Sequence, residues 1–106
     1  MEEEITYRLL KSIDENPNQS QRELSQSLDV SLGKLNYCLK ALVDKGWVKA
    51  RIFRKNPNKA GYLYLLTPRG VEAKAKVTVK FLKRKMREYE RIKEEIARLQ
   101  LETDPD

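Results

Sequence analysis

The sequence has no histidine and only one cysteine, Cys38, among its 106 residues. A single cysteine cannot form a disulfide within the chain. The lack of histidine excludes a Cys/His zinc motif and any histidine-based acid–base or nucleophilic triad. No paired-carboxylate site or phosphate-binding loop takes their place. We therefore predict that the protein is not an enzyme, and we predict no catalytic residues, no metal site and no cofactor.

Long apolar runs are missing as well. No stretch approaches the roughly 20 residues that span a bilayer. The first residues, MEEEITYRLL, are acidic and unlike a signal peptide. We expect a cytoplasmic protein without a membrane partner. The chain has room for one compact core and an appendage, because domains usually run to roughly 100–150 residues.

Positive charge is abundant but regional. Lys and Arg number 22 against 16 Asp and Glu, which gives a net charge of +6. Residues 1–31 and 88–106 each carry a net charge of −4, whereas residues 32–68 and 69–87 each carry +7. Such an excess favours a polyanionic partner without naming it.

Three helices are predicted in the first part of the chain. Apolar residues at helical spacing predict a helix over residues 2–15. Ser20–Glu23 form a capping box at the start of a second helix, residues 20–28. Ser31 is a further N-cap, and an apolar stripe predicts a third helix that ends at Gly46. The stripe consists of Leu32, Leu35, Leu39, Leu42 and Val43.

From Trp47 onward the pattern changes. Residues 47–53 and 61–66 are rich in aromatic and β-branched residues, and residues 55–60 between them have turn chemistry, so we predict a β-hairpin. Thr67-Pro68 is an N-cap followed by a proline at the first helical position, which predicts a last helix over residues 68–101.

The last predicted helix is about 50 Å long at about 1.5 Å per residue, too long to lie wholly against so small a core. A heptad seam runs along it and is regular only from Tyr89 onward. Its members are Val71, Ala75, Thr78, Leu82, Lys85, Tyr89, Ile92, Ile96 and Leu99. Two copies of the chain could bury the seam, and we expect a homodimer through Leu82, Tyr89, Ile92, Ile96 and Leu99. Alternatively, the helix folds back over the hairpin as a monomeric cover, or frays after Met86.

The predicted fold class is mainly α with a small β-hairpin (α+β). A winged helix-turn-helix DNA-binding domain occupies residues 1–67, a long C-terminal dimerisation helix residues 68–101, and a disordered polar tail residues 102–106. In a winged helix-turn-helix, the recognition helix enters the major groove of DNA and the wing reaches the flanking backbone. We therefore expect double-stranded DNA as the partner.

The third predicted helix has a face suited to reading DNA. With Leu35 at the centre of the buried side, the opposite side and its flanks carry Gly33, Lys34, Asn36, Tyr37 and Lys40. Asn36 can pair bidentately with adenine, Tyr37 can contact a thymine methyl or a phosphate, and the lysines can reach guanine edges or phosphates. Ser31 and the free amides at the helix start form a phosphate site, and Gly33 allows close approach. A merely solvated face is the alternative.

The predicted wing is basic. It carries Arg51, Arg54, Lys55 and Lys59, and no acidic residue occurs between residues 45 and 71. Such a strand pair can lie along phosphates or place an arginine in the minor groove. The alternative is that these charges protect an exposed strand edge from aggregation.

A second basic cluster, residues 80–87, follows on the last helix. Its cations are Lys80, Lys83, Arg84, Lys85 and Arg87. They could extend a DNA footprint, bind an acidic partner, lie on an anionic membrane surface or simply be solvated. Cys38 lies toward the buried side of the third helix, where we expect it to act as a small hydrophobe and not as a redox sensor.

Several segments closely resemble the exopolysaccharide-associated branch of the MarR-type bacterial regulators. They are Ser20–Leu24, Val30–Leu42, Lys45–Lys49, Gly61–Pro68 and Phe81–Met86. The resemblance implies a homodimeric, cytoplasmic winged-helix transcription factor associated with polysaccharide gene clusters. Many MarR-type regulators also hold a small-molecule effector near a dimer interface built from both chain ends. Here the first helix begins almost at residue 1, so we expect no additional N-terminal dimerisation helix and propose no effector pocket.

Two classes of function thus remain. In the first, a homodimer presents two recognition helices to a pseudo-palindromic site whose half-sites lie about 10 bp apart, or a multiple of that spacing. In the second, the winged helix is a protein-interaction module without sequence-specific DNA binding, and the hairpin and the seam are its docking surfaces.

Overall fold

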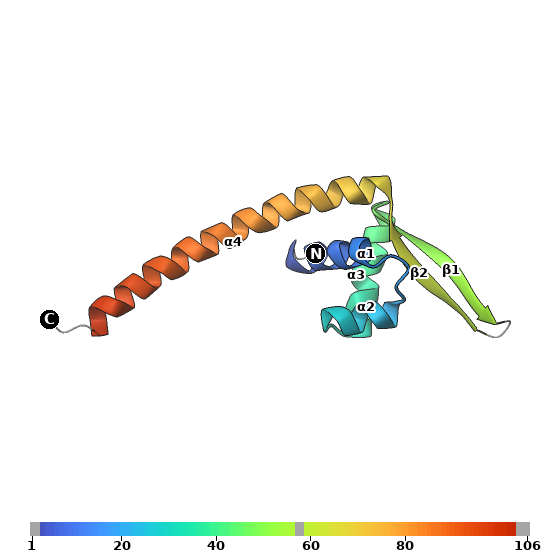
Figure 1. Ribbon diagram of the computed structural model, residues 1–106, viewed down its shortest axis with the longest axis horizontal. Helices are drawn as coiled ribbons and strands as arrows, with labels where there is room; N and C mark the ends of the chain where they lie inside the picture. The colour runs from blue at the N-terminus through green and yellow to red at the C-terminus, as the bar shows by residue number, and fades with distance from the viewer. Residues whose placement is uncertain (1–2, 57–58, 104–106) are drawn as a thin grey trace.

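The computed structural model describes residues 3–56 and 59–103. In chain order the elements are α1 (Glu3–Glu15), α2 (Gln21–Leu28), α3 (Leu32–Asp44), β1 (Val48–Asn56), β2 (Lys59–Leu66) and α4 (Pro68–Thr103). The first three helices form a compact lobe, from which the hairpin projects on one side and α4 on the other (Figure 1). The predicted fold class and the predicted order of elements are confirmed.

Local side-chain caps define where the short helices begin. The Ser20 hydroxyl accepts a hydrogen bond from the Glu23 amide at 3.2 Å and donates one to the Glu23 carboxylate at 3.1 Å. The Ser31 hydroxyl accepts from the Lys34 amide at 3.2 Å. Between them Asp29 ends α2 in the left-handed conformation, with φ at 54°. These contacts satisfy amides that a helix start leaves without an intrahelical partner, and they fix the turn between α2 and α3.

The core lies where α1, α2 and α3 meet the base of the hairpin. Its largest fully buried side chains are Leu9, Leu10, Ile13, Leu24, Leu35, Leu39 and Leu42. Each contributes on the order of 1.5–3 kcal/mol by leaving water. Two members of the predicted apolar stripe are outside this core: Leu32 is 47% exposed and Val43 is 37% exposed. Leu32 lies in the first turn of α3, and Val43 lines a groove between α3 and the hairpin.

The hairpin is longer than the sequence predicted. The antiparallel strands pair from Val48 opposite Leu66 out to Asn56 opposite Lys59, with one irregularity between Arg54 and Asn56. Most of the predicted turn, residues 55–60, is therefore strand, because backbone pairing overrides the weak strand propensity of lysine and asparagine. Residues 57–58 lie outside the described part of the chain.

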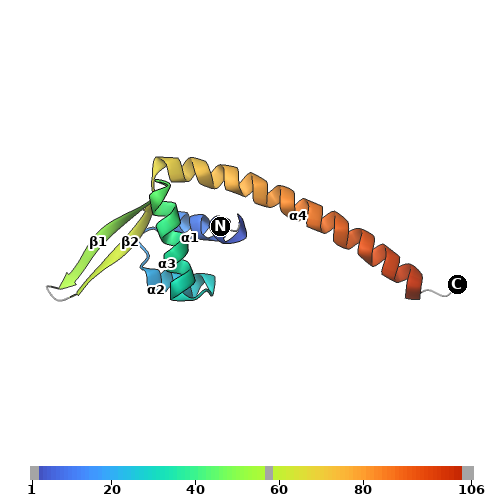
Figure 2. The same ribbon diagram turned by 180° about the vertical axis from the view of Figure 1, so that it is seen from behind.

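Only the base of the hairpin packs on the helices. Val48 and Tyr64 are buried, whereas Ile52, Phe53 and Tyr62 are about half exposed. Of the two tyrosines of β2, Tyr64 thus joins the core and Tyr62 does not. The outer part of the hairpin stands free of the lobe (Figure 2).

The start of α4 is pressed against the junction between α3 and β1. Thr67 caps α4 as predicted, because its hydroxyl accepts from the Gly70 amide at 3.0 Å and donates to the Gly46 carbonyl at 2.5 Å. The Thr67 amide donates to the Trp47 carbonyl at 3.0 Å. A Cβ atom on Gly70 would lie 1.9 Å from that carbonyl oxygen. Only glycine fits here without displacing the backbone.

Beyond the junction, α4 runs along α1 and then leaves the lobe. The rings of Tyr7 and Phe81 stack with their centroids 4.6 Å apart, and Lys74 pairs with Asp14 at 2.7 Å. The helix then continues to Thr103, which gives a molecule 75 Å long. It runs away from the hairpin (Figures 1 and 2), so it does not cover the hairpin and does not end at Met86.

The predicted tail, residues 102–106, begins too early. Glu102 and Thr103 belong to α4, because each adds an intrahelical hydrogen bond to a helix that is already formed. Residues 104–106 lie outside the described part of the chain.

The close approach at Gly70 leads to a prediction for stability. Replacing Gly70 with alanine should lower the free energy of unfolding by about 1–3 kcal/mol, because the added methyl group overpacks the junction. Gly33→Ala is the matched control, since a Cβ there meets nothing within 4 Å. That change should raise stability by about 0.5–1 kcal/mol. Urea unfolding followed by circular dichroism measures the free energy of unfolding of both variants. Equal stability of the two variants would contradict the close packing of Gly70 on the Trp47 carbonyl.

Candidate nucleic-acid interface

The predicted reading face of α3 is exposed on one side of the helix. Ser31, Gly33, Lys34, Asn36, Tyr37 and Lys40 are all exposed, whereas Leu35, Cys38 and Leu39 on the other side are buried. Tyr37 is 74% exposed, an unusual position for a large aromatic side chain. The helix thus presents two ammonium groups, an amide and a phenol to the surroundings.

The first turn of α3 has the features of an anion site. Ser31 caps the Lys34 amide, and the Leu35 amide donates to the Ser31 carbonyl at 2.9 Å. The amides of Leu32 and Gly33, which precede the first intrahelical bond, point out of the helix start. Space around Gly33 is open, so internal packing does not require a glycine there. A phosphate could therefore approach the backbone closely at this end of the helix.

Gln21 is a member of this surface that sequence reasoning missed. Its Nε2 donates to Asn36 Oδ1 at 3.2 Å and to the Tyr64 hydroxyl at 2.9 Å. One side chain at the start of α2 thereby connects the reading face of α3 with the base of the wing. The only hint in the sequence is its place directly after the Ser20 cap, since the start of α2 packs near α3 in a helix-turn-helix.

The wing lies beside the reading face. Asn36, Lys40, Tyr62 and Tyr64 line one groove between α3 and the hairpin. Arg51 and Arg54 are exposed on β1, and Arg51 donates to Asn18 Oδ1 at 3.2 Å. The side chains of the other two predicted wing cations, Lys55 and Lys59, lie outside the described part of the structure.

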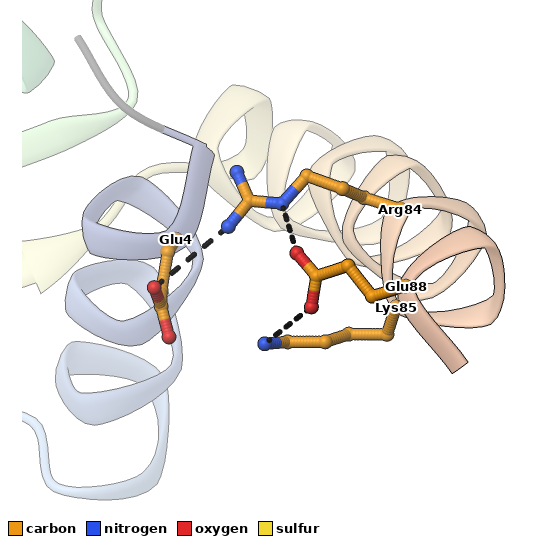
Figure 3. A network of polar contacts seen from close by, with 4 residues as sticks. All are labelled: Glu4, Arg84, Lys85 and Glu88. Atoms are coloured by element: carbon orange, nitrogen blue, oxygen red, sulfur yellow. Dashed lines mark hydrogen bonds and ion pairs between the residues drawn. The ribbon is translucent and has the colours of Figure 1, made fainter. Parts of the chain in front are cut away.

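The basic cluster at residues 80–87 divides into two groups. Arg84 lies 3.7 Å from Glu4 of α1 and 3.5 Å from Glu88, and Lys85 lies 3.3 Å from Glu88 (Figure 3). The hydrogen bond from Lys85, together with the positive charge nearby, holds the pKa of Glu88 below its ordinary value of 4.5. Arg84 thus serves the contact between α1 and α4, whereas Lys85 is paired within α4.

Lys80, Lys83 and Arg87 form the second group and are exposed. They remain available to a partner, whereas the Arg84 and Lys85 charges are already paired with carboxylates.

The predicted dimerisation residues form an exposed apolar stripe on α4. Leu82, Tyr89, Ile92, Ile96 and Leu99 are each between 49% and 61% exposed. Met86 is 59% exposed and extends the same stripe. Together these side chains form an exposed apolar surface of the kind that marks interaction sites in soluble proteins.

Among the residues that the structure describes, no helix is long and apolar enough to cross a membrane. Within the same residues, no group of three or more cysteine, aspartate or glutamate side chains could hold a metal ion.

The comparison with protein families identifies the lobe. Residues 2–49 match the family model for winged helix-turn-helix DNA-binding domains. The match spans α1 to α3, and the hairpin follows directly as the wing. The chain has a winged helix-turn-helix fold. Among curated protein sequences, none matches the chain significantly.

Solved structures of several bacterial proteins are similar to this fold. A mutant of MarR from E. coli, solved with operator DNA, is 34% identical over 69% of this chain and 51% of its own, with a TM-score of 0.58. The smu.1704 protein of Streptococcus mutans is 20% identical over 77% of this chain and 79% of its own, with a TM-score of 0.68. The PcaV regulator of Streptomyces coelicolor, solved with its natural ligand, is 12% identical over 93% and 74%, with a TM-score of 0.69.

The smu.1704 and PcaV structures are too distant in sequence from this chain to show more than a shared fold. MarR is closer in sequence, but this chain spans only about half of its length.

The division of the basic cluster leads to a second prediction. Arg84→Ala should lower the melting temperature by a few degrees at most, because it removes one partly exposed ion pair with Glu4 of α1 and one with Glu88 within α4. Lys83→Ala should leave the melting temperature unchanged. Since the pKa of Glu88 is lowered in the folded state, the contribution of its pair exists above pH 4.5 and is lost as the pH falls through the lowered value. Thermal melts at neutral and acidic pH would contradict this assignment if the two variants behaved alike.

Proposed function

We propose that the protein is a homodimeric transcriptional regulator that binds double-stranded DNA in a sequence-specific manner. The observation that carries the proposal is the exposed face of α3, with Lys34, Asn36, Tyr37 and Lys40, beside a wing that has no acidic residue. The winged helix-turn-helix fold supports it, as does the likeness to MarR, which has been solved with operator DNA.

In the proposed complex, α3 enters the major groove. Lys34 and Lys40 contact guanine edges or phosphates, and Tyr37 contacts a thymine methyl or a phosphate. A phosphate is bound at the first turn by Ser31 and the amides near Gly33.

The wing then lies along the flanking backbone, with Arg51 and Arg54 as its described cations and Lys55 and Lys59 further toward its tip. These contacts position the protein on the duplex, whereas α3 reads the bases.

Symmetry leads to an expectation for the form of the operator, and the resemblance leads to one for the genes it controls. A homodimer with two-fold symmetry binds a pseudo-palindrome, and its half-sites lie about 10 bp apart or a multiple of that spacing. The resemblance to the exopolysaccharide-associated regulators makes polysaccharide gene clusters the proposed targets.

The DNA-binding proposal predicts a large difference between cognate and random DNA. The protein should bind a duplex from the upstream region of its own gene about a hundredfold or more tightly than a scrambled duplex. Asn36→Ala should narrow that difference. Lys40→Ala should weaken binding to both duplexes and lower the slope of log affinity against log salt by about one. Fluorescence anisotropy across a salt series measures these quantities.

Two controls sharpen this experiment. Lys11→Ala removes an exposed lysine of α1 that lies outside the proposed interface. It should change neither the ratio of the affinities for the two duplexes nor the slope of log affinity against log salt. Gly33→Ala keeps the fold but adds a methyl group where the backbone approaches the phosphate, and it should weaken binding. Weak, equal binding of both duplexes at low salt only would reject the regulator and favour the protein-interaction module.

The homodimer is proposed to form along the exposed stripe of α4. The stripe begins at Leu82, between Phe81 and Arg84, which contact α1. From there α4 continues away from the lobe (Figure 1). A second copy offers the same stripe, so each chain covers the apolar side chains of the other. Burial of six such side chains in each chain contributes far more than any surface ion pair.

The charges of α4 favour an antiparallel arrangement of the two copies. Residues 69–87 carry +7 and residues 88–106 carry −4. A parallel pair would place like charges together, whereas an antiparallel pair places the basic half of one helix beside the acidic half of the other. The stripe allows this arrangement, because Leu82 then faces the partner's Leu99 and Tyr89 faces the partner's Ile92. The two DNA-binding lobes lie at opposite ends of such a dimer.

Disulfide trapping tests both the dimer and its direction. Leu82→Cys and Leu99→Cys chains should form a disulfide-linked dimer when they are mixed and oxidised. Neither variant should do so alone, because equivalent residues lie about 26 Å apart in the antiparallel pair. The unmodified chain is the control, since its one cysteine is buried. Self-linking of each single variant would show a parallel dimer, and a monomer in analytical ultracentrifugation would reject the dimer altogether.

A further inference from the structure

The side-chain amide of Asn36 has a defined orientation in the absence of DNA. Its Oδ1 accepts a hydrogen bond from Gln21 Nε2 at 3.2 Å. Asn36 Oδ1 carries two lone pairs, and the bond from Gln21 occupies one of them and fixes the plane of the amide, so that Nδ2 is directed away from Gln21 and can donate to a ligand. Asn36 is exposed on the reading face, and it therefore presents a donor there.

Gln21 is itself held by the core. The same Nε2 donates to the hydroxyl of Tyr64 at 2.9 Å, and Tyr64 is only 5% exposed. Nε2 has two hydrogens, and each has an acceptor in this arrangement. Reversing the Asn36 amide alone would place its NH2 group against the NH2 group of Gln21 and lose the bond, so Asn36 can turn only if Gln21 turns as well. Gln21 is in turn bonded to the hydroxyl of the buried Tyr64, which links the orientation of Asn36 to β2.

We propose that Gln21 is a specificity-determining residue, which makes Asn36 a hydrogen-bond donor toward the base that it contacts. The inference rests on the proposed DNA-binding function. Bidentate pairing with adenine requires Asn36 to accept from N6 and donate to N7 at the same time. With Oδ1 turned toward Gln21, Asn36 instead reads a base acceptor, and guanine offers two in the major groove, N7 and O6.

The arrangement also links the wing to the recognition helix. Gln21, Asn36 and Tyr64 line the groove between α3 and the hairpin, and no two of them are neighbours in sequence. A movement of β2 relative to α3 would shift the Tyr64 hydroxyl and so release Gln21. The base preference at one position of the operator therefore depends on the position of β2 relative to α3.

The decisive variant reverses the polarity of the contact. Gln21→Glu replaces a donor with a carboxylate that only accepts, so the Asn36 amide turns to donate to it and exposes Oδ1. The variant should still fold, because a glutamate in the first turn of a helix is favourable. At the operator position that Asn36→Ala identifies, preference should move from guanine to bases that present a donor, adenine or cytosine. We expect a change of at least about fivefold in relative affinity there, and little change elsewhere.

Two further variants separate positioning from a general loss of binding. Gln21→Ala should weaken the preference at that same position and leave the salt dependence unchanged. Tyr64→Phe keeps the buried ring but removes the hydroxyl, and it should have the same effect in weaker form. Competition binding against duplexes substituted at each position provides the measurement. An unchanged preference in Gln21→Glu and Gln21→Ala would overturn the proposal.

A measurement without DNA keeps this test independent of the regulator proposal. In the free protein, the side-chain NH2 protons of Gln21 should exchange with water more slowly than those of the exposed Gln26, and Tyr64→Phe should remove that difference. Heteronuclear NMR of the uncomplexed chain reports it. Slow exchange together with a failure to find specific DNA would reject the regulator but leave the Gln21 contacts in place. Fast exchange in the unmodified protein would reject the inference itself.

Discussion

The contact between Gly70 and the Trp47 carbonyl sets the position of everything outside the helical core. At this point the end of α3, the start of β1 and the start of α4 meet. Three hydrogen bonds of Thr67 join them, two from its hydroxyl and one from its amide. The wing leaves the junction in one direction and α4 in the other (Figure 2). Because no side chain separates the two backbones, the angle between recognition helix, wing and long helix is fixed by covalent geometry and hydrogen bonds.

The features that the sequence predicts well are those determined by neighbours along the chain. Ser20, Ser31 and Thr67 are caps because their hydroxyls reach amides three residues later, a relation that spacing alone reveals. The buried and exposed sides of α3 follow in the same way from the helical period. The prediction of a reading face with Asn36, Tyr37 and Lys40 thus agrees with their exposure, although their contacts with DNA remain a prediction.

Features that depend on distant residues could not be predicted in this way. Arg84 appeared as one of five similar cations, and only the packing of α1 beside α4 shows that Glu4, eighty residues earlier, neutralises it. Alternation within β2 could not decide between Tyr62 and Tyr64, because the answer depends on where the lobe ends under the hairpin. Gln21 joins Asn36 and Tyr64 through separations of 15 and 43 residues. Its role is visible only when three elements are seen together.

The uninterrupted course of α4 has a consequence for how such a protein can change over evolution. An α-helix advances about 1.5 Å and turns about 100° with each residue. A single insertion between the junction and the apolar stripe would therefore rotate the lobe by more than a quarter turn relative to the stripe, besides moving it outward. In the proposed homodimer, only length changes close to a whole number of helical turns would keep both copies of α3 facing the same side of a duplex. The length of α4 between the junction and the stripe would thus be constrained to steps of about 3.6 residues.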